Sequence, residues 1–187
     1  MSALPCFGAI LLLVLVVAFA LIAIYNRLIV LRNRVDNSWS QIDVQLRRRY
    51  DLIPNIVETV KGYAAHEKTT FENVVKARQA GIDAKTVKDQ AQAENMITGA
   101  LRQLFALSEA YPDLKANQNF LALQEELSST ENKIAFSRQY YNDSVQTFNT
   151  RQQQFPANLI AGMFGFTPAD FFEIEDPAAR QAPKVKF

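Results

Sequence analysis

The chain has 187 residues, a formal net charge of +1 and a sequence pI of about 7.8. This balance excludes the strongly basic surface that nucleic-acid-binding proteins carry, so we expect no nucleic acid among its partners. After the first apolar segment about 160 residues remain, which is enough for one domain with its own core.

Residues 7–25 carry no charged side chain and read FGAILLLVLVVAFALIAIY. A helix of this length spans roughly 29 Å, close to the thickness of about 30 Å of the hydrocarbon layer. A cleaved signal peptide is the alternative, because Ala18-Phe19-Ala20 resembles a cleavage site. Residues 1–6 lack Lys and Arg, however, and the apolar run continues past that site. We predict a short N-terminal segment at 1–6 and a transmembrane helix at 7–25, with the lipid bilayer as its partner.

The flanks of this segment bear on its orientation. Arg27, Arg32 and Arg34 follow it, and no basic side chain precedes it. The positive-inside rule therefore favours a cytoplasmic C-terminal domain. Cys6, the only cysteine, carries no information on the redox compartment.

Residues 26–155 have a helical composition and show no strand-like alternation. Apolar residues recur at spacings of three and four from Leu28 to Val74, which predicts one helical face that persists until Gly81. Pro54 interrupts the backbone hydrogen bonding of this helix, either as a kink or, if it opens fully, as a break.

Two more helices are predicted, the first from about Thr86 to Ala110. The second begins near Asn117, a good N-cap residue, and runs to Pro156. Amphipathic helices joined by short turns form antiparallel bundles. The predicted fold is all-α, with an N-terminal transmembrane helix followed by an antiparallel bundle of three to four long helices over 26–155.

The following segment, 156–175, is rich in phenylalanine. It either caps the end of the bundle or forms a surface for a partner, another subunit or the membrane. The candidate assembly residues are Phe164, Phe166, Phe171 and Phe172. Residues 176–187 are predicted to be a disordered tail.

The sequence shows no motif for catalysis, a metal or a cofactor. His66 is the only histidine, and the residues after Glu67 do not complete an HExxH zinc motif. GxSxG, Walker and GxGxxG motifs do not occur. We therefore expect no enzymatic activity, no metal and no cofactor.

Four charged residues fall on or beside apolar stripes. Asp43 and Arg49 lie on the first helix, and Glu131 and Arg138 lie on the third. Because an unpaired buried ion costs several kcal/mol, such residues are expected to pair. They predict a structural polar layer that sets the register of the bundle; a ligand or ion site at this layer is the alternative.

Several strings carry a resemblance to a known family. They are WSQIDVQLRRRYDLIPN at 39–55, EAYPDLKAN at 109–117, NFLALQEEL at 119–127 and ENKIAFSRQYYN at 131–142. In order and spacing they resemble the LemA family, and the likeness extends from residue 25 to about 172. The resemblance implies a short N-terminal anchor followed by a helical bundle.

The resemblance also implies a bacterial membrane protein without an established enzymatic activity. Relatives are associated with envelope or internal-membrane organisation, and with neighbouring membrane proteases and TPM-domain proteins. Some look like lipoproteins, which places their domain outside the cytoplasm; here Ile24 holds the place of the lipidated cysteine, so lipid attachment is not carried over. The side of the membrane therefore stays open.

The functional expectation joins both lines of reasoning. We expect a single-pass membrane protein, non-enzymatic and homo-oligomeric, that self-associates and organises a bacterial membrane or its protein partners. The alternative is an adaptor or regulator of a membrane protease or envelope complex.

Overall fold

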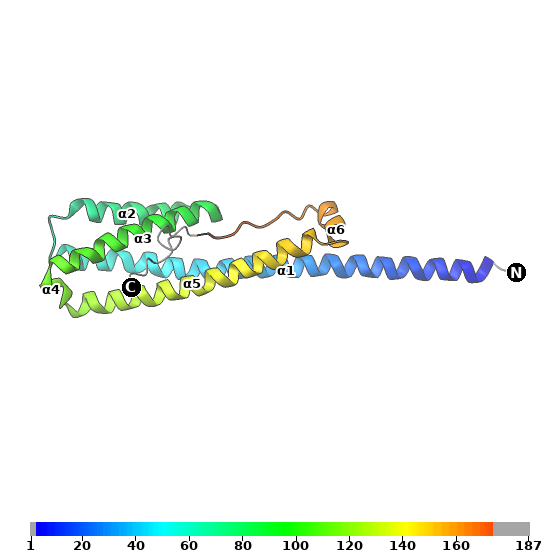
Figure 1. The fold of residues 1–187 in the computed structure, drawn as a ribbon, viewed down its shortest axis with the longest axis horizontal. Helices are drawn as coiled ribbons and strands as arrows, with labels where there is room; N and C mark the ends of the chain where they lie inside the picture. The colour runs from blue at the N-terminus through cyan, green and yellow to red at the C-terminus, as the bar shows by residue number, and fades with distance from the viewer. Residues whose placement is uncertain (1–2, 174–187) are drawn as a thin grey trace, which may run out of the picture. The chain divides into compact units, whose positions relative to one another are not determined.

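The computed structural model describes residues 3–173, with side chains from Phe7 onward. Within this part of the chain all regular structure is helical, which confirms the predicted fold class (Figure 1). The predicted tail at 176–187 lies outside the described residues. The helices are α1 (Ala3–Lys61), α2 (Lys68–Asp83), α3 (Val87–Ala110), α4 (Pro112–Lys115), α5 (Gln118–Gln153) and α6 (Ala157–Met163).

The chain divides into two compact units. Of the described residues, 3–40 and 140–169 form the first, called here the juxtamembrane unit. Residues 41–139 and 170–173 form the second, the bundle unit. α1 and α5 cross the boundary, so the first part of each helix belongs to one unit and the second part to the other.

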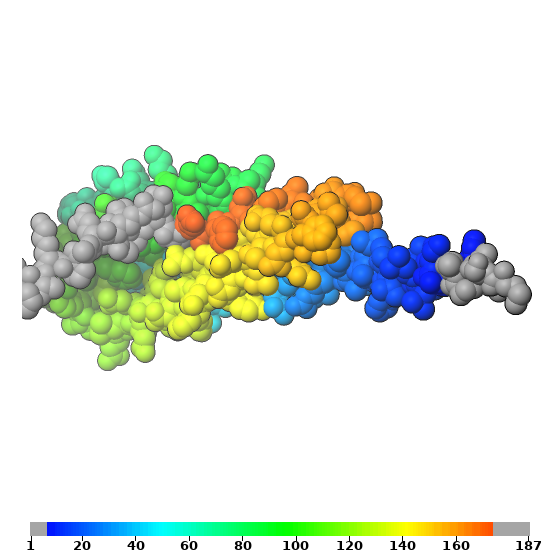
Figure 2. All heavy atoms as spheres, turned by 45° about the vertical axis from the view of Figure 1, so that its right-hand side comes forward, coloured from blue at the N-terminus to red at the C-terminus, as the bar shows by residue number. Residues whose placement is uncertain are grey.

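The N-terminal part of α1 has the properties of a membrane anchor. In the described residues, α1 is the one helix long and apolar enough to cross a bilayer. Its large apolar side chains between Phe7 and Ile22 are exposed, and Figure 2 shows this part of α1 in dark blue at the surface. Lipid can cover such a surface, since a helix satisfies its own backbone hydrogen bonds.

The first long helix ends earlier than the sequence predicts. α1 passes through Pro54 without ending and stops at Lys61, so the helical face predicted to reach Gly81 is divided between α1 and α2. The turn between them is well bonded: the carbonyl of Val60 accepts hydrogen bonds from the amides of Tyr63 and Ala64. The apolar spacing runs on unbroken because the turn residue Ala64 is itself buried.

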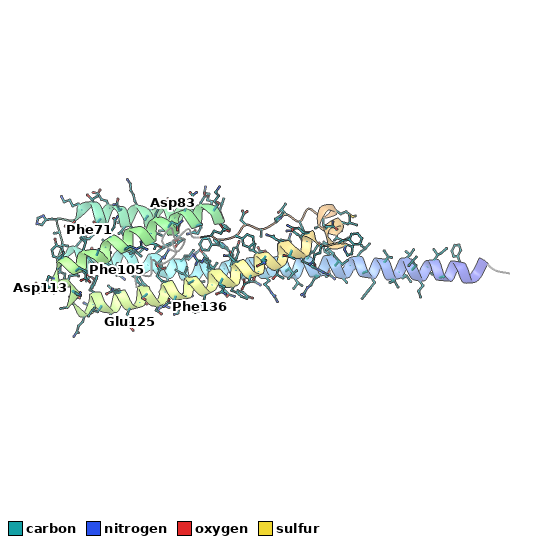
Figure 3. All side chains as sticks on the ribbon, viewed as in Figure 1. Phe71, Asp83, Phe105, Asp113, Glu125 and Phe136 are labelled. Carbon is teal, nitrogen blue, oxygen red and sulfur yellow. The ribbon has the colours of Figure 1, made fainter. Side chains whose placement is uncertain are left out.

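The bundle unit consists of the second part of α1, α2, α3 and the first part of α5. In this chain order, successive helices run in opposite directions (Figure 1). The predicted helix starts are correct. The side-chain oxygens of Thr86 and Asn117 each accept a hydrogen bond of 3.0 Å from a backbone amide three residues later, as N-cap residues do. Phe105 of α3, labelled in Figure 3, lies 6.3 Å from Phe120 of α5 between ring centroids. Apolar side chains from all four helices fill the core, including Ile53, Val74, Ile97, Leu104, Leu127 and Ile134.

Gly81 lies inside α2, which continues to Asp83, and its role is close packing. A Cβ atom at this position would lie 2.6 Å from Oη and 2.8 Å from Cζ of Tyr50, and 3.2 Å from Cδ1 of Ile97. Real Cβ atoms do not approach a ring so closely. Glycine is therefore required here because α1 and α2 approach each other at the Tyr50 ring.

Gly81→Ala should destabilise the bundle by about 1–3 kcal/mol, because the phenol of Tyr50 must move. Thermal or chemical unfolding followed by circular dichroism measures this loss. Gly99→Ala is the matched control: Gly99 is exposed within α3 and has nothing within 4 Å of its Cβ position. It should stabilise by about 0.5–1 kcal/mol, as glycine removal from a helix interior does. Equal effects at both positions would contradict the close approach.

Candidate functional site

The juxtamembrane unit packs α6 against the part of α1 that follows the apolar span. Ala157, Ile160 and Ala161 are buried, and the last two form an apolar cluster with Leu28 of α1. The irregular residues after α6 are held by Asn149 of α5. Its side chain donates to the carbonyl of Ala169 and accepts from the amide of Ala169, both at 2.9 Å.

Aromatic contacts mark the point where α1 leaves its apolar span. The ring of Tyr25 lies 4.7 Å from that of Phe164 and 5.9 Å from that of Phe166. The guanidinium of Arg32 lies 5.5 Å from the centroid of Phe166, a cation–π distance. Aromatic and basic side chains of this kind gather where a membrane helix meets water.

Several apolar side chains in and beside α6 are exposed. They are called here the collar, and they are Phe155 before the helix, Leu159 and Met163 within it, and Phe164 directly after it. Phe155 is 79% exposed and Met163 78%. Residues 152–169 contain no charged side chain, so nothing within this stretch offsets the apolar surface. Contiguous exposed apolar patches generally mark contact with another surface.

The four candidate assembly residues differ in exposure. Phe164 belongs to the collar, whereas Phe166 is half-buried beneath it and packs 6.4 Å from Phe148. In the bundle unit, Phe171 is exposed but Phe172 is fully buried. Phe172 therefore acts as a core residue and is not available to another subunit. Leu159 and Met163 belong to the collar but were not among the candidates. The sequence signal for them was their spacing of four residues in a segment without charged side chains.

A second group of functional candidates is the polar cluster in the bundle unit. Arg49 is 1% exposed, and its guanidinium forms ion pairs with the carboxylates of Glu94 and Glu131. The hydroxyl of Tyr50 donates to Glu94 and accepts from Gln90 Nε2 at 2.6 Å. Gln90 Nε2 also donates to Glu94 at 3.0 Å. The cluster thus ties α1 to α3 and α5.

The predicted polar layer corresponds to this cluster only in part. The structure brings Arg49 and Glu131 together, but Asp43 forms a surface ion pair with Arg47 at 2.9 Å. Arg138 is half-buried, and no ion pair to it occurs among residues 7–173. Glu94, the fully buried acid, was not predicted. The signal for it was its position three residues before Ile97, which places it on the apolar stripe of α3.

The environment of Tyr50 alters its acidity. Burial raises the pKa of the Tyr50 phenol above its ordinary value, and the nearby guanidinium of Arg49 and the hydrogen bond from Gln90 oppose that rise. In the folded state the phenol therefore keeps its proton to higher pH than a free tyrosine. Among the described residues, no group of three His, Cys, Asp or Glu side chains is arranged to hold a metal ion.

The first prediction for the cluster separates its two acids. Glu94→Ala removes a carboxylate that is 0% exposed and should destabilise by about 3–5 kcal/mol, because it breaks a buried pair. Glu131→Ala should cost under about 1 kcal/mol, because Glu131 is 41% exposed and Arg49 keeps Glu94. Denaturant unfolding of both variants measures the difference. A reversed order would show that Glu131 is the principal partner of Arg49.

The second prediction concerns pH. Because the pKa of Tyr50 is raised in the folded state, its contribution to stability is complete below about pH 10. This contribution is lost as the pH rises through the folded pKa. The wild-type protein should therefore lose more stability as the pH rises above about 10 than Tyr50→Phe does. Both proteins share every other titratable group, so the difference in melting temperature isolates Tyr50. Parallel pH profiles would contradict the shift.

Comparison with known proteins places this arrangement in a family. The LemA family profile matches residues 38–187. Magnetosome protein MamQ 2 of Paramagnetospirillum magneticum is 26% identical over 87% of this chain and 70% of its own length. Magnetosome protein MamQ of Magnetospirillum gryphiswaldense is 23% identical over 82% of this chain and 66% of its own. Protein LemA of Metamycoplasma hominis is 29% identical over 73% of this chain and 63% of its own. Because the family profile covers most of the sequence, this chain belongs to the LemA family.

Proposed function

We propose that this protein is a membrane-anchored, non-enzymatic helical protein that self-associates and so organises a bacterial membrane or its protein partners. The membrane-associated relatives, LemA and MamQ, support the location and are not known enzymes. The exposed apolar part of α1 supplies the anchor. The single observation that carries the proposal of self-association is the uncovered collar in the same unit as that anchor.

The apolar area of the collar is sufficient for a contact between subunits. Burying one large apolar side chain contributes roughly 1.5–3 kcal/mol. Two or three collar residues from each subunit would therefore supply several kcal/mol. The anchor confines the subunits to one membrane, which lowers the entropic cost of their meeting. Weak contacts between collars of neighbouring subunits would therefore be sufficient for association within the membrane.

The buried parts of the same segment explain why the collar has a defined shape. Ala157, Ile160 and Ala161 of α6 are buried, and the ring of Phe166 contacts that of Tyr25 edge to face. The exposed side chains consequently project from a packed support. A surface held in this way can make specific contacts without a costly ordering step.

Met163→Ser with Phe164→Ser should reduce the size of the particle in mild detergent while leaving the helices folded. Size-exclusion chromatography with light scattering measures the size, and circular dichroism measures helicity. The matched control is Val44→Ser with Phe136→Ser, which removes two exposed apolar side chains from the bundle unit. Figure 3 labels Phe136 on α5, where it is 73% exposed. The control should keep its size.

Other outcomes separate the alternatives. If the collar variant keeps the wild-type size, the collar is not the assembly surface. A wild-type protein that is monomeric in detergent would contradict self-association and favour an adaptor that presents partners to a membrane protease. Phe166→Ser tests the support itself and should loosen the packing of α6, because this ring is half-buried.

A further inference from the structure

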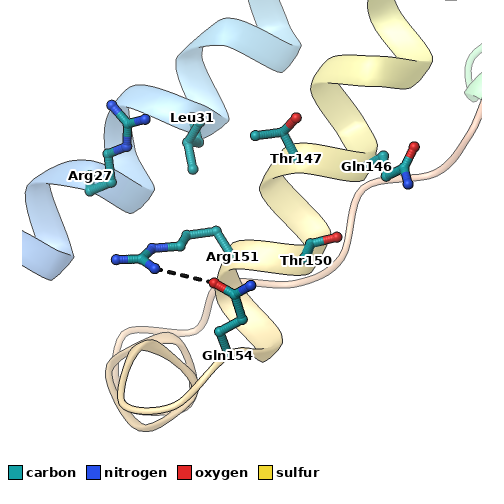
Figure 4. Close-up of a pocket in the computed structure, with 7 residues that line it drawn as sticks. All are labelled: Arg27, Leu31, Gln146, Thr147, Thr150, Arg151 and Gln154. Atoms are coloured by element: carbon teal, nitrogen blue, oxygen red, sulfur yellow. Dashed lines mark hydrogen bonds between the residues drawn. The ribbon is translucent and has the colours of Figure 1, made fainter.

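The juxtamembrane unit contains a groove between α1 and α5 that is lined mostly by polar and basic residues (Figure 4). Its volume is about 500 Å³. Arg27 and Leu31 of α1 line one side, and Thr147, Thr150 and Arg151 of α5 line the other, with Gln154 just beyond the helix. Two arginines thus face one opening, and no acidic side chain lines it.

The charges of these arginines are not balanced nearby. Arg27 forms no ion pair among residues 7–173, and Arg151 donates only to Gln154 Oε1, at 3.2 Å. The aspartates of this unit are Asp36 and Asp143. They lie nine residues from Arg27 and eight from Arg151, which is about 12–14 Å along each helix. The groove is therefore a cationic site that an anion would complete.

The position of the groove indicates which anion. Arg27 follows the last residue of the apolar span, Tyr25, by two positions, so its side chain lies at the level of the lipid headgroups. We propose that the groove binds the phosphate of an anionic phospholipid, such as phosphatidylglycerol. The acyl chains of that lipid run along the exposed apolar side chains of α1 between Phe7 and Ile22.

The donors in the groove suit a phosphate. A guanidinium presents parallel N–H groups that match phosphate oxygens, and such charge-assisted bonds are stronger than neutral ones. Because Gln154 Oε1 accepts from Arg151, its amide NH2 group stays available as a further donor. Thr147 does not serve as a donor, since its hydroxyl is bonded to the carbonyl of Asp143 at 2.8 Å.

The helix dipole of α5 opposes anion binding in the groove, because the C-terminal end of the helix is its negative pole. The carbonyls of Thr150 and Gln154 are nevertheless occupied, because they accept from the amides of Gln154 and Asn158 at 3.2 and 2.9 Å. These two carbonyls are therefore less able to repel an anion in the groove.

The test uses the full chain in a neutral detergent, with phospholipid binding measured by native mass spectrometry. Phosphatidylglycerol should bind more tightly than zwitterionic phosphatidylcholine. Arg27→Gln with Arg151→Gln should weaken phosphatidylglycerol binding by about 25-fold, about fivefold for each arginine near an anionic surface. Helicity should not change. The control, Arg34→Gln with Arg102→Gln, removes the same charge from exposed positions outside the groove and should bind as the wild type does.

Three results would overturn the proposal. Equal weakening in the groove variant and the control would show a general charge effect. Equal binding of phosphatidylglycerol and phosphatidylcholine would exclude selection for a net negative headgroup. If inorganic phosphate binds to the wild type and not to the groove variant, while phosphatidylglycerol binds equally to both, the site is one for free phosphate. These outcomes do not depend on particle size, so they are separate from the test of self-association.

Discussion

A guanidinium buried in an apolar core constrains the arrangement of every helix around it. Arg49 is 1% exposed, so its charge must meet an opposite charge inside the bundle. Glu94 of α3 and Glu131 of α5 provide this, and both must therefore sit at the level of Arg49. A shift of one turn, about 5.4 Å, in α3 would leave a buried ion unpaired, whereas the same shift in α5 would break only the pair with the part-exposed Glu131. We propose that the pair of Arg49 and Glu94 sets the register of α3 against α1, although apolar residues of similar volume would stabilise the bundle as much.

The neighbours of Arg49 follow from the same constraint. Tyr50 is the next residue of α1. Its hydroxyl and the side-chain amide of Gln90 both donate hydrogen bonds to the carboxylate of Glu94. This brings the Tyr50 ring toward α2, where Gly81 leaves room for it. Arg78 of α2 then donates to the backbone carbonyl of Tyr50 at 2.7 Å. One buried charge therefore accounts for a polar side chain, a glycine and a helix contact that seem unrelated along the chain.

The sequence was sufficient for the helical fold, the apolar span and the N-caps at Thr86 and Asn117, because these depend on local periodicity and local hydrogen bonds. It was not sufficient for the break after Lys61. Apolar spacing reports which side chains are buried, and the turn residue Ala64 is buried as a helical residue would be. The pair Phe171 and Phe172 shows a similar limit. In an irregular segment no period relates neighbouring residues, so opposite exposures leave no trace in the sequence.

The juxtamembrane unit combines two surfaces that a membrane interface can satisfy together. The collar offers apolar side chains without a charge between residues 152 and 169, while the groove offers two arginines without an acid beside them. In water both features are unfavourable, since one exposes apolar area and the other concentrates like charge. Near a bilayer, other subunits anchored in the same membrane are available to the collar, and lipid phosphate is available to the groove. Tyr25 and Arg27 mark this boundary along α1, and Phe164 and Arg151 occur close to it in space from the opposite end of the chain. The return of α5 and α6 to the start of the domain therefore builds a surface that neither segment could form alone.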